Sequence, residues 1–233
     1  MKEKLSLKEI KTVFVHTIPV MAGYIVLGMG FGLLLKANGY GILWAFLMSL
    51  LVYAGSMQYL AVDLIAGGAS LITVALTTLM VNARHLFYGI SMIAKYRNMG
   101  KERAYDIFAL TDETYSLVCR DEIAGIDNKR SYYFFVSLFN QCYWLLGSIA
   151  GSAVGSVLKI NTKGIDFALT ALFLTVATEQ WLSTDDHSSA LIGLGMSVLS
   201  LVIFGSDGFL IPAMLAITAA LSAKKYIGRA KHE

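Results

Sequence analysis

The chain has 233 residues, of which 56% are hydrophobic and only 15% are charged, and its net charge is +3. A soluble domain is usually about one quarter charged, so this composition excludes an ordinary soluble fold. The basic residues flank long apolar stretches, which indicates membrane orientation signals and not a nucleic-acid surface.

Seven apolar segments follow one another along the chain, and a bilayer crossing takes about 20 apolar residues. They cover residues 17–35, 41–66, 70–94, 131–158, 166–182, 190–204 and 207–222. Backbone polar groups in lipid must be satisfied within the protein, so each segment is expected to be helical. We therefore predict an all-α fold, a polytopic transmembrane bundle of about seven segments.

Two stretches complicate this topology. The segment 41–66 is long and contains Gly55 and Ser56, where a break would produce a discontinuous helix. The less apolar stretch 104–118 is a candidate eighth element. Both chain ends and the 95–130 loop are rich in Lys and Arg, which indicates the cytoplasmic side. Three full crossings before the loop would place it on the other side, so either 41–66 is re-entrant or 104–118 also crosses.

A weak internal repeat is also present. Residues 24–28 resemble 143–147, and residues 55–60 resemble 177–182. The repeat predicts a single transport domain over 1–233, with halves at about 14–120 and 131–222. Substrate sites of transporters often lie at such repeat interfaces. Chance recurrence of small and aromatic residues is the alternative.

Glycines at helical spacing predict close contact between two helices. Gly147, Gly151 and Gly155 recur every four residues, each followed by a serine, and Gly28 and Gly32 form a shorter version in the first segment. Small residues of this kind let two helix backbones approach each other.

The third segment ends in four polar residues, Asn82, Arg84, His85 and Tyr88. An ionisable residue inside a span is costly and normally faces a cavity or a partner. His85 is also a candidate proton carrier, because imidazole titrates near neutral pH. The alternative is that Arg84 reaches to the membrane surface.

Other polar residues flank or follow the apolar segments. Ser56 and Gln58 flank the expected helix break, where a hydroxyl and an amide can bind an amino acid, or else bond between helices. Asp112 and Glu113 in the 104–118 stretch line a cavity or form a solvated patch, and Gln180 lies near the end of the fifth segment. The candidate substrate-binding or coupling residues are therefore Ser56, Gln58, Asn82, Arg84, His85, Tyr88, Asp112, Glu113 and Gln180.

Motifs for catalysis and for metal or cofactor binding are absent from the sequence. It contains no phosphate-binding loop, zinc-protease signature, nucleophile elbow or dinucleotide fingerprint. The short loop 185–187 resembles a metal cluster only superficially, and the two cysteines have no zinc spacing. We predict no catalytic residue, metal or cofactor, and transport that is not driven by ATP hydrolysis in this chain. Two competing hypotheses are an intramembrane enzyme, with His85 and Asp112 or Glu113 as acid and base, and a scaffold that anchors a partner.

Two motifs together resemble the AzlC family, the large subunits of bacterial branched-chain amino acid exporters. They are YAGSMQY at 53–59 and VNARHLFYG at 81–89. The family pattern is also matched by TDE at 111–113 and GIDFALTALF at 164–173, so that the resemblance covers nearly the whole chain. One departure is Glu179, where the pattern has an apolar residue.

The resemblance implies export of leucine, isoleucine, valine or their analogues by a multi-pass protein of the bacterial plasma membrane. It also implies pairing with a small, hydrophobic AzlD-type membrane subunit. Without the resemblance, the residues indicate only a transporter-like helical bundle with polar groups in the middle of the chain.

Overall fold

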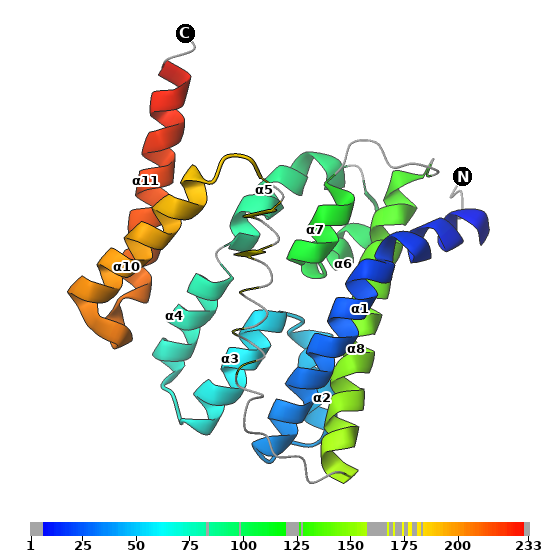
Figure 1. Cartoon of the computed structure of the whole chain (residues 1–233). Coiled ribbons are helices and arrows are strands. Elements are labelled where there is room, and N and C mark those ends of the chain that lie inside the picture. Colours follow the sequence, from blue (N-terminus) through cyan, green and yellow to red (C-terminus); the bar gives the residue numbers. More distant parts are fainter. Residues whose placement is uncertain are drawn as a thin grey trace. The chain divides into compact units, whose positions relative to one another are not determined.

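The structure is a computed structural model. It describes residues 7–82, 84–97, 99–119, 126, 128–157 and 184–230, with isolated positions between 167 and 182. The elements in these parts of the chain are all α-helices (Figure 1). In order they are α1 (Leu7–Ala37), α2 (Ile42–Leu51), α3 (Gly55–Ala66), α4 (Leu71–Val81), α5 (Arg84–Tyr96), α6 (Glu102–Phe108), α7 (Asp112–Val118), α8 (Lys129–Val157), α10 (Ser188–Gly208) and α11 (Leu210–Ala230).

The chain divides into two compact units, residues 1–170 and 171–233. The first unit contains α1 to α8. In the second, α10 packs against α11. A single transport domain with repeat halves at 14–120 and 131–222 stays a prediction.

The all-helical architecture matches the prediction, whereas the described residues contain only two or three clear candidate spans. Two helices in the described ranges are long and apolar enough to cross a membrane, within Glu9–Ala37 and Ser188–Gly205. Helices α4 and α5 form a third candidate if they count together as one bent span. The seven-segment count is therefore not confirmed.

Breaks divide two of the apolar segments, one where the sequence predicts a break and one where it does not. The expected break in 41–66 lies between α2 and α3, where Tyr53 adopts the left-handed conformation with φ 43°. The segment 70–94, predicted as one helix, is instead two helices whose axes differ by 46°. Asn82 caps the end of α4, and asparagine favours such helix ends because its side chain competes for backbone hydrogen bonds.

The 104–118 stretch contains two short helices, α6 and α7. Each has seven residues, which corresponds to about 10 Å of helix. Neither helix crosses a bilayer by itself. Thr111 separates them as the N-cap of α7, accepting the backbone N–H of Thr114 at 3.3 Å.

Helices α1 and α8 lie side by side and form the main contact of the first unit (Figure 1). Their backbones meet at four of the glycines whose spacing predicts such a contact, Gly28, Gly32, Gly147 and Gly151, whereas Gly155 faces only the side chains of Leu33 and Lys36. A Cβ atom on Gly151 would lie 2.1 Å from the carbonyl oxygen of Met29, and one on Gly32 equally close to that of Ser148. Glycine is therefore required where the two backbones cross.

The core beside this crossing is aromatic. The ring of Phe31 stacks on that of Trp144 with centroids 6.3 Å apart, and Tyr24 meets Trp144 edge to face at 5.5 Å. The hydroxyl of Tyr59 donates to the carbonyl of Leu27 at 2.6 Å. These contacts fix α3 and α1 against α8, and so position the start of α3 in the site below.

Candidate functional site

Arg84 lies where the starts of three helices meet. It is the first residue of α5, and its Nη1 lies 2.6 Å from a carboxylate oxygen of Asp112, the first residue of α7. Its Nη2 donates to the hydroxyl of Ser56, in the first turn of α3, at 3.1 Å. Helix N-termini carry partial positive charge, so together with Arg84 they favour anionic groups at this junction.

Part of the hydrogen-bonding capacity at the junction is unused. Nε of Arg84, Oδ1 of Asp112 and the hydroxyl of Tyr88 are buried and have no hydrogen-bond partner in the described part of the chain. Buried polar atoms are normally paired. The Tyr88 hydroxyl lies close enough to the Asp112 carboxylate to interact with it, so a ligand with donor and acceptor groups would compete for these atoms.

His85 and Tyr88 extend from α5 beside this pair. Their rings lie 5.0 Å apart, and the Tyr88 ring also stacks on Tyr115 of α7 at 5.4 Å. Asn82 is connected to this group through its backbone, because its carbonyl accepts the N–H of His85 at 2.9 Å. Asn82 thus shapes the turn into α5, and it does not share a helix with His85 as the spacing predicts.

Helix α7 is held in place by two contacts that the sequence did not reveal. The hydroxyl of Tyr24 in α1 donates to the Glu113 carboxylate at 2.6 Å. The Asn140 amide in α8 donates to the hydroxyl of Thr114 at 3.0 Å. A polar residue in the middle of an apolar segment is the signal that would have pointed to Asn140.

Gln58 is completely buried, and its amide joins helices around the break between α2 and α3. Its oxygen accepts the indole N–H of Trp144 at 3.0 Å, and its nitrogen donates to the hydroxyl of Ser49 at 3.4 Å. These partners favour the interhelical interpretation of Gln58 over direct ligand binding. Gln180 lies outside the described residues.

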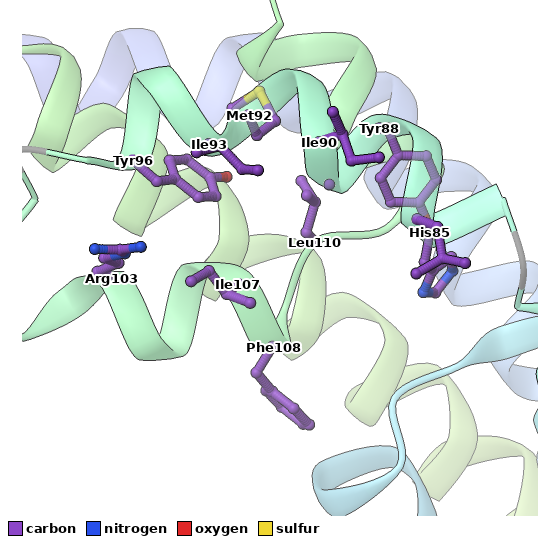
Figure 2. A pocket seen from close by; sticks show the side chains of 12 residues that line it. His85, Tyr88, Ile90, Met92, Ile93, Tyr96, Arg103, Ile107, Phe108 and Leu110 are labelled. Atoms are coloured by element: carbon purple, nitrogen blue, oxygen red, sulfur yellow. The ribbon is translucent and has the colours of Figure 1, made fainter.

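A cavity of about 430 Å³ lies between α5 and α6 (Figure 2). Most of its lining is apolar, and ligand pockets usually measure about 300–1,000 Å³. Figure 2 shows His85 and Tyr88 at one end and Tyr96 and Arg103 at the other. Between them lie Met92, Ile93, Ile107 and Leu110. The cavity therefore begins beside the residues that follow Arg84 and continues along an apolar wall.

The 185–187 loop lies in the second unit. Asp186 pairs with Lys224 at 3.0 Å and accepts the backbone N–H of Ser188 at 2.9 Å. These bonds to the charged form hold the pKa of Asp186 well below its usual range, the Ser188 hydroxyl being the largest cause. The His187 ring stacks on Trp181 with centroids 4.0 Å apart. This loop is thus linked to α11 through an ion pair.

Comparison with known proteins decides the family. The model of the AzlC protein family matches residues 19–158, which include Ser56, Arg84 and Asp112. The branched-chain amino acid transport protein AzlC of Bacillus subtilis is 43% identical over 91% of this chain and 84% of its own length. The chain belongs to the AzlC family.

Other AzlC relatives are membrane proteins by name. An uncharacterized membrane protein of Haemophilus influenzae is 43% identical over 92% of this chain and 88% of its own length. The inner membrane protein YgaZ of Escherichia coli is 25% identical over 88% of each chain. No solved structure matches this AzlC-family chain.

Proposed function

We propose that this chain is the large subunit of a membrane transporter that exports branched-chain amino acids or close analogues. The observation that carries the proposal is the Arg84–Asp112 pair beside an apolar cavity of about 430 Å³. The name of the Bacillus subtilis relative supports the substrate class.

The pair is complementary to an amino acid zwitterion. The guanidinium fork of Arg84 suits the substrate carboxylate, and Oδ1 of Asp112 can accept the substrate ammonium. When the site is empty, Arg84 and Asp112 neutralise each other. When substrate enters, each gains a new opposite charge, so neither Arg84 nor Asp112 is left unpaired.

The cavity provides the preference for an aliphatic side chain. Each methylene group removed from water contributes about 0.8 kcal/mol. Leucine has three more carbon atoms than alanine, so a fully buried leucine side chain should bind more tightly than alanine by about 2 kcal/mol. A polar side chain would lose its bonds to water against this wall and bind weakly.

The remaining parts of the proposal are expectations from the sequence. The chain is a multi-pass protein of the bacterial plasma membrane, with about seven apolar segments, and it works by secondary transport with a small AzlD-type subunit. His85, Tyr88, Asn82, Glu113 and Gln180 remain candidates for substrate contact or coupling. An intramembrane enzyme is not favoured, because Asp112 is paired with Arg84 and Glu113 with Tyr24.

Efflux of labelled leucine from bacterial cells that lack other leucine exporters tests this function. Cells that produce the chain and its proposed partner should lose leucine faster than cells without it. Arg84→Gln should slow efflux by about tenfold or more, because a hydrogen bond to a charged group contributes about 1.5–3 kcal/mol. Arg97→Gln, an exposed arginine just after α5, is the matched control. Equal efflux with and without the chain would overturn the proposal.

A further inference from the structure

Asp106 in α6 is a completely buried carboxylic acid that the site described above does not use. Neither of its oxygens has a hydrogen-bond partner in the described part of the chain. Two buried hydroxyls lie near it, those of Tyr96 in α5 and Ser137 in α8, and the Ser137 hydroxyl is close enough to favour the charged form of Asp106. An ionised carboxylate in such a place would lack the pairing that buried charges need.

Charged and titratable groups face Asp106 from each helix around it. They are Tyr96 from α5, Glu102 and Tyr105 from α6, and Arg130 from α8, while Tyr133 of α8 faces Tyr96. The nearest cation among them, Arg130, is already paired with Glu102. Burial raises the pKa of Asp106 to about 7, the Glu102 charge adds to the rise, and Ser137 and Arg130 oppose it. The seven-residue helix that holds Asp106 is outside the candidate spans.

Helix α6 connects this acid with the cavity. On one side it packs against α8, where the Tyr105 hydroxyl donates to Gln141 at 2.6 Å. On another side Arg103, Ile107 and Phe108 line the cavity (Figure 2). Tyr96 belongs to both places, since its ring lines the cavity and its hydroxyl interacts electrostatically with Asp106. Asp106 thus lies on the helix that forms one wall of the cavity and interacts with Tyr96 of the opposite wall.

We infer that Asp106 binds and releases the proton that couples transport to a pH gradient. With a proton bound, the carboxyl is neutral and its O–H can donate to Ser137 or Tyr96, so α6 stays packed on α8. When the proton leaves to water, the carboxylate is unpaired, and α6 must move or admit water to solvate it. Because α6 forms one wall of the cavity, this movement also weakens the packing of that wall. This inference rests on the proposed transport function.

Proteoliposomes that contain the protein with its partner subunit separate coupling from transport. Exchange of labelled leucine without a gradient measures transport alone, and leucine accumulation under an imposed pH gradient measures coupling. Asp106→Asn, which is close to the protonated form in shape and charge, should retain exchange. It should lose gradient-driven accumulation by about tenfold or more, within the usual range of coupling free energies. Lys101→Gln, at an exposed position at the start of the same helix, is the control and should remain coupled.

A second variant keeps the test independent of how well Asp106→Asn folds. The Ser137 hydroxyl lowers the pKa of Asp106, so Ser137→Ala should move the pH midpoint of transport upward. A purely structural role would lower the rate without moving the midpoint. Gradient-driven accumulation by Asp106→Asn at the wild-type level, or an unmoved midpoint in Ser137→Ala, overturns the coupling role alone. A wild-type protein that exchanges no leucine overturns the proposed function, and the coupling role with it.

Discussion

Gly151→Ala is the substitution that most sharply probes the crossing of α1 and α8. The added Cβ would lie 2.1 Å from the carbonyl oxygen of Met29, whereas ordinary van der Waals contact begins at 3.4 Å. Because the obstacle is backbone and not a flexible side chain, no rotamer change can relieve the overlap. The two helices must move apart by more than about 1 Å, and contacts along the crossing weaken together.

The size of the effect follows from two opposing contributions. Replacing an interior helix glycine by alanine stabilises the helix by about 0.5–1 kcal/mol. Overfilling a packed contact costs about 1–3 kcal/mol, and occasionally more. Gly23→Ala is the matched control, since it lies in α1 with no atom within 4 Å of its added Cβ. The helix gain is common to both variants, so we expect them to differ by the overfilling cost of about 1–3 kcal/mol, with Gly23→Ala the more stable.

The assay is the apparent melting temperature of each variant in detergent, followed by size-exclusion chromatography after heating. Gly151→Ala should melt below the wild type and Gly23→Ala at or above it. If Gly151→Ala has the same melting temperature as Gly23→Ala and transports normally, α1 and α8 do not cross at these glycines, and the packing argument is refuted.

Three further outcomes follow from the contacts described. Trp144→Phe leaves the buried oxygen of Gln58 without its donor, so it should lower stability by about 1–3 kcal/mol in thermal melts, whereas Trp44→Phe at an exposed tryptophan should not. The folded state raises the pKa of Asp106 to about 7 from about 4 when unfolded. Between pH 4 and 7 the folded state therefore binds more protons than the unfolded state, so melting curves should show stability falling as pH rises from about 4 to 7. Asp106→Asn should remove the contribution of Asp106 to this fall. Arg84→Lys keeps the charge but loses the planar fork, so leucine transport assays should show a higher KM that leucine saturation largely overcomes.

The sequence predicts helix breaks only where local residues mark them. Gly55 and Ser56 mark the break that separates α2 from α3. The break after α4 was missed, because a lone Asn82 in an apolar segment also fits a continuous helix. The two helices of 104–118 were missed because Thr111 works as an N-cap, and a threonine beside two acids also fits a solvated helix face.

Part of the candidate site follows from the energetics of single residues. A charge in an apolar segment needs a partner, which predicts an acid beside Arg84, and the structure places Asp112 there. Their role in substrate binding stays a proposal. The bonds of Gln58 to Trp144 and of Tyr24 to Glu113 join residues more than eighty positions apart. Such contacts depend on how helices pack, which local spacing does not determine.

Asp106 was missed for a related reason. Its neighbours along the chain, Tyr105 and Ile107, fit an amphipathic surface helix, on which an acidic residue would face water. The packing of α6 on α8 buries it instead. A buried acid in a short polar helix can thus be recognised only after the neighbouring helices are placed.

Binding of labelled leucine to the purified protein with its partner tests the central claim most directly, namely that Arg84 and Asp112 hold the zwitterion while the cavity holds the aliphatic side chain. We predict saturable binding that isoleucine and valine displace. Leucine amide, which lacks the carboxylate, and 4-methylpentanoate, which lacks the ammonium, should not displace it, and Arg84→Gln should abolish binding. Leucine binding to Arg84→Gln with wild-type affinity, or displacement by leucine amide as effective as by isoleucine, would contradict the account.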